Sequence, residues 1–305
     1  MRAEHKASVG KALLIALAGF FILAVGDAVV KSIAGAWPAP AVSALRYNFG
    51  AIGLAAAVAL RHGRAGFVFP RPWLQLGRGA AVSLATICFF LAVMAMPLAD
   101  ATAIQFTSPI LTAILSGLVL RERVPRAAWA AIGLAFAGVL IVLRPNFLAL
   151  GAAALYPLGA ALGMAWLIIF NRKSAGDAPV LVMQFVLALV AAPMLLVAAA
   201  TLAAVGGPAF AVPFPSSVVI AKCALVAFTA SIGHLMIYWA TTHAGAALVS
   251  PMTYVQLLVA AALGWMWFGD APDLVSLGGA ALIIGGGLLL WRSQKPPLPA
   301  QGKPE

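Results

Sequence analysis

The stretch KALLIALAGFFILAVGDAVVKSIAG, residues 11–35, decides the fold. It carries no charged residue between Lys11 and Asp27. A helix needs about 20 apolar residues to cross the hydrocarbon of a bilayer, and this run is long enough. An ionised side chain near the bilayer centre costs roughly 3 kcal/mol or more. Asp27 and Lys31 are therefore expected to have partners and a purpose inside the protein.

The composition of the whole chain agrees with a membrane protein. Of its 305 residues, 64% are hydrophobic and only 9% are charged, and the mean hydropathy is +1.04. Soluble domains carry about 25% charged residues, so a soluble core is excluded and lipid must be the solvent. Cys88 and Cys223 both lie in apolar runs. A disulfide or a metal site is therefore not expected.

Apolar segments separated by Pro, Gly or charged residues predict ten membrane spans. All ten are expected to be helices, because open strands cannot satisfy their backbone groups in lipid. The predicted spans lie near residues 12–35, 40–60, 73–96, 98–120, 127–143, 148–171, 179–201, 216–240, 245–268 and 274–291.

The basic residues predict the orientation. With the N-terminus in the cytoplasm, fourteen Lys and Arg residues fall in cytoplasmic segments, and Arg144 alone falls on the other side. This is a strong positive-inside bias. We expect a multi-pass protein of the bacterial inner membrane with both termini cytoplasmic. The net charge of +11 then faces anionic lipid of the bilayer, and nucleic acid is not an expected partner.

The two halves of the chain repeat. A shift of 148 residues places Glu122 on Asp270, Gly138 on Gly286 and Arg144 on Arg292, without a gap between spans 3–5 and spans 8–10. Each half holds five spans, so the second half must be inverted in the membrane. Repeats of this kind build alternating-access transporters with a site near the midplane. The expected units are residues 11–145, residues 148–293 and a cytoplasmic tail, 294–305.

Polar residues inside the spans repeat in the same way. On span 3, Ser83, Thr86 and Phe90 share one helix face, and the shift carries them to the face of Ser231, His234 and Tyr238. The face of Thr102, Gln105 and Ser108 on span 4 corresponds to that of Ser250, Thr253 and Gln256 on span 9. Polar faces toward lipid would be unfavourable, so the four faces are predicted to surround a central polar cavity. Interhelical hydrogen bonding in a closed bundle is the alternative interpretation.

The charged residues of the opening stretch form a predicted cluster. Asp27 and Lys31 lie four residues apart on one helix and can pair. Arg46 lies a few residues into span 2 from the same side, and a short connection brings it close. The cluster is either a structural ion-pair lock or, with its surplus positive charge, an anion site. The second half has no counterpart of Asp27, because Ile169 occupies that position.

Two tracts resemble a known family. PLADATAIQFTSPILTAILSGLVLRERVPRAAWAAIGLAFAGVLIVLRP, residues 97–145, and AALVSPMTYVQLLVAAALGWMWFGDAPD, residues 246–273, resemble the EamA domain of the drug/metabolite transporter superfamily. So do GDAVVKSIAG and SALRYNFG near the start of the chain. The resemblance covers about residues 11–293. It implies an all-α integral membrane protein with ten transmembrane helices, arranged as two inverted five-helix repeats around a central cavity.

A secondary transporter of small organic metabolites is the preferred function. The expected substrate-binding residues lie on the polar faces or are aromatic side chains near them: Ser83, Thr86, Phe90, Gln105, Ser108, Trp166, His234, Tyr238, Tyr254 and Gln256. Rings at such positions can stack on flat or cationic substrates, although ordinary packing explains any single one.

Within the superfamily, export of amino acids, including aromatic or other amphiphilic ones, is preferred. Uptake of a larger flat or cationic metabolite, such as S-adenosylmethionine or riboflavin, is the alternative. An enzyme is disfavoured, because no nucleophile–base pair and no metal-ligand spacing is present; a purely structural membrane protein would not need the repeated polar faces. No catalytic residue, metal or cofactor is expected, and the chain is expected to be a monomer or a weak homo-oligomer.

Overall fold

A computed structural model describes residues 2–119, 126–143, 151–244, 253–271 and 273–293, and the described residues form helices and turns without any strand. The first half holds α1 (Arg2–Lys31), α2 (Ala39–His62), the 3₁₀ turn η1 (Gly63–Gly66), α3 (Pro72–Ala95), α4 (Leu98–Gln105), α5 (Ser108–Val119) and α6 (Arg126–Leu143). The second half holds η2 (Gly151–Leu155), α8 (Tyr156–Lys173), α9 (Val180–Val205), η3 (Pro208–Phe210), α10 (Ser217–Ala244), α12 (Tyr254–Phe268) and α13 (Leu274–Ser293).

The lengths and compositions of these helices confirm an all-α integral membrane protein. Among the described residues, six segments are long and apolar enough to cross a membrane, and two shorter segments, in α12 and α13, are also apolar. The full number of ten spans stays a prediction. The predicted starts of two spans, at residues 148 and 245, lie outside the described residues.

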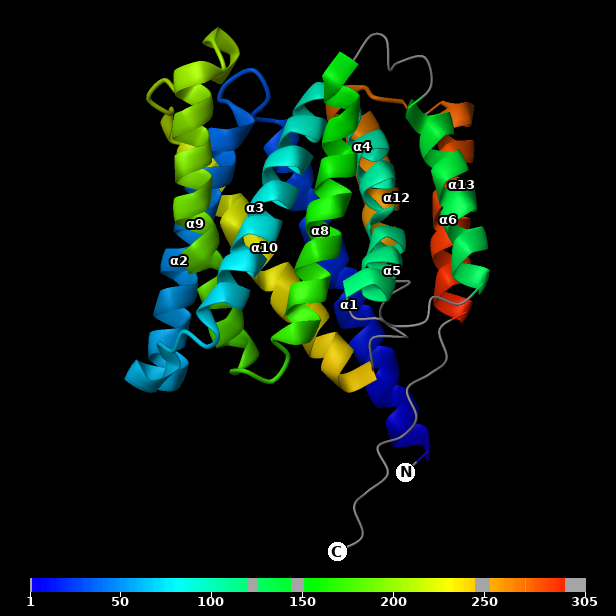
Figure 1. The fold of residues 1–305 in the computed structure, drawn as a ribbon, viewed down its shortest axis with the longest axis horizontal. Coiled ribbons are helices and arrows are strands. Elements are labelled where there is room, and N and C mark those ends of the chain that lie inside the picture. The colour runs from blue at the N-terminus through cyan, green and yellow to red at the C-terminus, as the bar shows by residue number, and fades with distance from the viewer. Residues whose placement is uncertain (1, 120–125, 144–150, 245–252, 272, 294–305) are drawn as a thin grey trace, which may run out of the picture.

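The pairs of helices that pack together are those expected if the two halves of the chain are structural repeats. α1 packs against α10 and α3 packs against α8, while α2 packs against α9, α4 against α12 and α6 against α13. When each span is exchanged with its counterpart five spans away, the pair α1–α10 becomes the pair α8–α3. The other three pairs map onto themselves. The start of α1 and the end of α13 lie at the same end of the bundle (Figure 1).

Small residues bring some of these pairs close together. A Cβ atom added at Gly163 of α8 would lie 2.6 Å from the backbone nitrogen of Ala85 on α3. One added at Gly138 of α6 would lie 2.6 Å from the carbonyl oxygen of Gly279 on α13. Such contacts are typical of helices that associate in lipid, where close packing replaces the hydrophobic effect.

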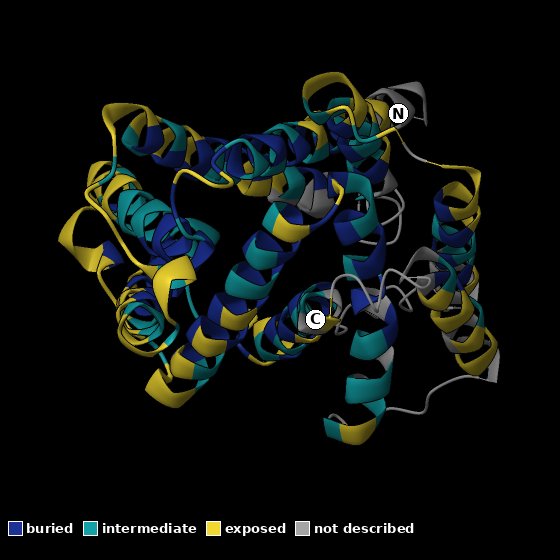
Figure 2. Cartoon of the chain, turned by 90° about the horizontal axis from the view of Figure 1, so that it is seen from above, coloured by how far each residue is buried: buried dark blue, intermediate teal, exposed yellow. Residues whose placement is uncertain are grey.

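The core lies between α1, α2, α3 and α10. Val30, Val42, Val93 and Val226 are all buried there. Large apolar side chains such as Leu140 remain exposed on the outside, as lipid-facing positions must. Seen from above, buried residues gather where helices face one another, and exposed residues lie toward the periphery (Figure 2).

The fourth predicted span is a broken helix. α4 ends at Gln105, two turn residues follow, and α5 begins at Ser108. In the turn, the amide of Thr107 donates to the carbonyl oxygen of Ile104 at 3.0 Å. This bond spans three residues, whereas a bond in an α-helix spans four. Pro109 explains the break, because proline has no N–H to donate to the carbonyl four residues earlier.

Candidate functional site

A polar contact joins the two halves of the chain inside the bundle. The side-chain amide of Gln256 on α12 donates to Asp27 Oδ2 on α1 at 2.9 Å. Asp27 is half-buried, and a carboxylate in such a place needs donors. The sequence singled out both residues, but for different clusters. The structure brings the charged residue of span 1 and the polar face of span 9 together.

The predicted pair of Asp27 with Lys31 is wrong. Lys31 Nζ instead lies 2.5 Å from Asp270 Oδ2, just beyond the end of α12. It also donates to the carbonyl oxygen of Met96 at 2.9 Å and lies 5.2 Å from the centroid of the Phe268 ring. The long Lys31 side chain extends beyond the end of α1. There it donates to Asp270 and to the Met96 carbonyl oxygen, and not to Asp27 on its own helix. The sequence analysis did not predict Asp270, Phe268 and Met96 as neighbours of Lys31, because they are far from it along the chain.

Arg46 lies against aromatic rings. Its guanidinium carbon is 4.4 Å from the centroid of the Tyr47 ring and 5.3 Å from that of Phe90. Its Nε is buried and has no hydrogen-bond partner among the described residues. The guanidinium therefore lies against one ring of α2 and one ring of α3.

The predicted face of α3 is turned toward this arginine. Phe90 lies beneath its guanidinium, and the hydroxyl of Thr86 lies 3.2 Å from that of Tyr47. Ser83, one turn further along, is buried, and its hydroxyl has no partner among the described residues. Tyr47 was missed by the sequence analysis. Its position next to Arg46, opposite the predicted face of α3, is set only by the packing of α2 against α3.

The remaining predicted residues are more scattered. His234 on α10 is exposed, and its Nδ1 contacts the carbonyl oxygen of Ala230 at 2.7 Å. Gln105 is half-buried at the end of α4, and buried Ser108 begins α5. The side chains of Tyr238 and Tyr254, and all of Ser250, lie outside the described residues.

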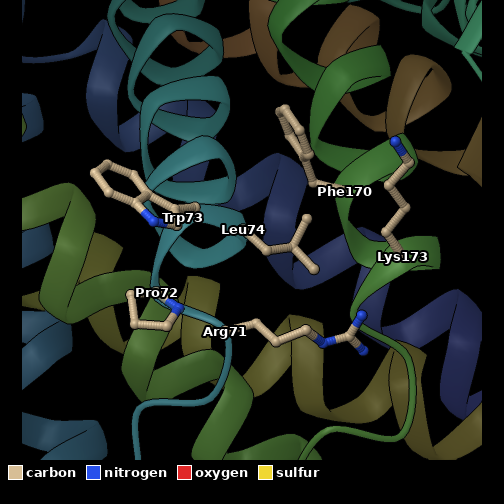
Figure 3. Close-up of a pocket in the computed structure, with 6 residues that line it drawn as sticks. All are labelled: Arg71, Pro72, Trp73, Leu74, Phe170 and Lys173. Atoms are coloured by element: carbon tan, nitrogen blue, oxygen red, sulfur yellow. The ribbon is translucent and has the colours of Figure 1, made fainter.

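Trp166 belongs to a different contact. Its ring stacks on that of Phe170, with centroids 5.6 Å apart and an interplanar angle of 26°. Phe170 also lines a surface pocket of about 580 Å³ between the start of α3 and the end of α8 (Figure 3). The pocket is lined by Arg71, Pro72, Trp73, Leu74, Phe170 and Lys173. It lies at one end of the bundle and includes none of the predicted substrate-binding residues.

Polar contacts fasten this end of the bundle. Arg71 donates from its Nε to both carboxylate oxygens of Asp177, at 2.9 and 3.0 Å, and this hydrogen bonding raises the pKa of the Arg71 guanidinium. Further along α3, Arg78 donates to the side-chain oxygens of Asn171, at 2.7 Å, and Gln75, at 2.6 Å. These contacts tie α3 to α8 and to the loop after it.

Comparison with known proteins shows which family has this architecture. Both halves, residues 10–144 and 151–292, match the EamA-like transporter family. The chain belongs to that family. An EamA-like protein is a multi-pass membrane transporter rather than an enzyme, and the contacts between its halves are contacts between its two repeats. Among the described residues, no group of three metal-binding side chains is close enough to hold an ion.

Several relatives of this EamA-like transporter have names that state what they carry. It is 30% identical to a riboflavin transporter of Rhizobium johnstonii, over 73% of this chain and 71% of that protein. It is 25% identical to the pseudopaline exporter CntI of Pseudomonas aeruginosa, over 93% and 96%. It is 26% identical to an S-adenosylmethionine uptake transporter of Rickettsia bellii, over 74% of each chain. A solved crystal structure with 22% identity matches 92% of this chain and 96% of its own with a TM-score of 0.59, which supports the fold.

Proposed function

We propose that this EamA-like protein is a secondary transporter that moves a small organic metabolite across the bacterial inner membrane by alternating access. The proposal is carried by the contact of Asp27 with Gln256, because a polar pair that joins the two repeats inside the bundle suits a site between inverted repeats. The two repeats are residues 11–145 and 148–293. The termini, including the tail 294–305, are cytoplasmic, and the chain is a monomer or a weak homo-oligomer.

Export of an amino acid, aromatic or otherwise amphiphilic, is the preferred activity. Support comes from the side chains next to Arg46 and from the contact between Asp27 and Gln256. Phe90 and Tyr47 offer ring surface for an apolar side chain, while Thr86, Gln256 and Asp27 offer hydrogen-bonding groups for a polar end. Of the predicted substrate-binding residues, Ser83, Gln105, Ser108 and His234 complete the pathway. Trp166 is assigned to its cytoplasmic end, where it stacks on Phe170.

Uptake of a larger flat or cationic metabolite is the second candidate. The names of two relatives favour it, since one is a riboflavin transporter and another takes up S-adenosylmethionine. The aromatic side chains near Arg46 suit flat ligands as well as small amino acids. A screen of solute flux in proteoliposomes separates the candidates, because it reports which solutes move and in which direction under a proton gradient.

Three tryptophan substitutions test the pathway itself. Thr86→Trp, Gln105→Trp and Gln256→Trp each place an indole on a predicted polar face, and each is expected to reduce flux at least tenfold while the protein remains folded. Leu140→Trp is the matched control, because Leu140 is exposed on the outside of the bundle. Full flux through all three variants would rule out a pathway between these faces.

A further inference from the structure

A basic pocket lies between the two repeats at one end of the bundle. It is formed by the start of α3, from the first repeat, and the end of α8, from the second (Figure 3). Its volume of about 580 Å³ lies within the range of roughly 300–1,000 Å³ that is usual for sites of small ligands. None of the residues proposed for substrate binding lines it. The orientation predicted from the basic residues puts this end of the bundle in the cytoplasm.

The charged side chains at the pocket leave one positive charge over. Arg71 and Lys173 line it, and one carboxylate, that of Asp177, pairs with Arg71. Arg71 uses Nε and Nη2 for this pair, so the donors on Nη1 are left for a ligand. Lys173 is exposed and forms no ion pair or hydrogen bond with the part of the chain that the structure describes. An anion in the pocket therefore meets a free ammonium group and one edge of a fixed guanidinium.

The adjoining wall of the pocket is apolar. Phe170 is fixed from two sides, because it stacks on Trp166 and because a Cβ atom added at Gly77 would lie only 3.0 Å from its Cζ atom. The half-buried side chain of Leu74 lines the same pocket. The pocket therefore offers charge on one side and a fixed apolar surface on the other.

An exposed tryptophan puts the pocket at the level of the lipid headgroups. Trp73 is 86% exposed and lies in the first turn of α3, a helix long and apolar enough to cross a membrane. Tryptophan is enriched at this level, since its ring is apolar and its N–H is polar. Leu74 and Phe170 lie further into their helices than Arg71 and Lys173 do. The apolar wall is therefore on the hydrocarbon side of the charges.

We propose that this pocket binds an anionic phospholipid of the membrane, whose phosphate group contacts Lys173 and Arg71. The glycerol and the start of the acyl chains lie along Leu74 and Phe170. A soluble phosphate would use the charges without the apolar wall, so a lipid is the occupant that matches both. Basic pockets between transmembrane helices are known to bind anionic headgroups. The inference goes beyond the proposed function, because it names a second ligand at a site outside the transport pathway.

Lipid titration of the purified protein in neutral detergent tests this inference. The probes are dioleoyl phosphatidylglycerol, which is anionic, and dioleoyl phosphatidylcholine, which has the same chains and no net charge. Native mass spectrometry gives the dissociation constant of the first lipid bound. Wild-type protein is expected to prefer phosphatidylglycerol about fivefold, the effect of one basic residue next to an anionic lipid. Phosphatidylglycerol is also expected to raise the midpoint of thermal unfolding more than phosphatidylcholine does, because it binds the folded protein more tightly.

Three variants identify the charge that matters. Lys173→Gln removes the surplus positive charge and is expected to abolish the preference without unfolding the protein, because the side chain is exposed. Lys173→Arg keeps the charge and is expected to keep the preference. Arg61→Gln is the matched control. It removes an exposed positive charge at the end of α2, outside the pocket but at the same predicted end of the bundle, and is expected to keep the preference.

Several results would overturn the inference. Equal binding of the two lipids by wild-type protein is one, and a preference that survives Lys173→Gln is another. An equal loss in Lys173→Gln and Arg61→Gln would show a general attraction of basic residues to anionic lipid and no pocket. Glycerol 3-phosphate, which carries the phosphate without the chains, is expected not to displace phosphatidylglycerol even in large excess. Displacement would assign the pocket to a soluble phosphate and contradict the lipid.

Discussion

The contact between Lys31 and Asp270 allows a quantitative test of the packing between the repeats. We consider Lys31→Met, which keeps the length of the side chain, and Asp270→Asn, which keeps its shape. Either change leaves one ionised partner without its counter-ion. The side chains are only 12% and 26% exposed, so solvent cannot fully replace the lost partner.

The expected loss lies between two limits. Exposed ion pairs contribute about 0.2–1 kcal/mol, while removal of one partner from a buried pair costs about 3–5 kcal/mol. For a pair of this exposure with a 2.5 Å contact, we expect each single variant to lose about 2–3 kcal/mol of unfolding free energy. Part of the loss for Lys31→Met belongs to its hydrogen bond with the carbonyl oxygen of Met96.

A double-mutant cycle isolates the pair. Unfolding free energies are measured by denaturant titration in detergent for wild type, the two single variants and the double variant. The double variant is expected to lose little more than a single one, which gives a coupling of about 2 kcal/mol. Lys11→Met, an exposed lysine on the same helix, is the control. A coupling below about 0.5 kcal/mol, the usual limit of additivity, would refute the assignment of Asp270 as the partner of Lys31.

Three further changes test the remaining architecture. Gly163→Ala is expected to destabilise the protein by about 1–3 kcal/mol through overpacking of α8 against α3, whereas Gly53→Ala, with open space around it, is expected to stabilise it slightly; equal effects in thermal unfolding would contradict the close contact. Cysteine at exposed Ala209 is expected to react with an impermeant thiol reagent from outside intact cells, and cysteine at exposed Ala65 only after permeabilisation; the opposite result would reverse the predicted orientation. Asp177→Asn is expected to lower thermal stability slightly and only at low salt, because the pair with its exposed arginine is screened; a large loss that persists in salt would show that the pair is not a surface contact.

The sequence predicted much of the fold because lipid imposes simple requirements on a chain. Runs without charge mark helices, and the shift of 148 residues predicts which helices correspond. The break in span 4 was also readable in principle, since Pro109 follows a polar face at Gln105 and Ser108. It was not predicted because the apolar run continues across it.

The partners of the charged residues were less predictable. Helical spacing suggested Lys31 for Asp27, but a lysine near a helix end extends to whatever acceptors the neighbouring elements present. Asp270 lies 239 positions away, and only tertiary packing brings it there. Tyr47 was overlooked for the same reason. Spacing assigns residues to a face, and the neighbouring helix decides what that face meets.

The interruption between α4 and α5 divides one span between two sets of neighbours. The short helix α4 packs against α12 and also against α8, while α5 packs chiefly against α8. A continuous helix would transmit any tilt from one membrane face to the other. The two turn residues, Phe106 and Thr107, interrupt the helix, so α4 and α5 need not tilt together as one rigid rod. For the alternating access proposed above, a span interrupted in this way would let the two ends of the protein change shape one after the other, as a carrier that is never open at both faces requires.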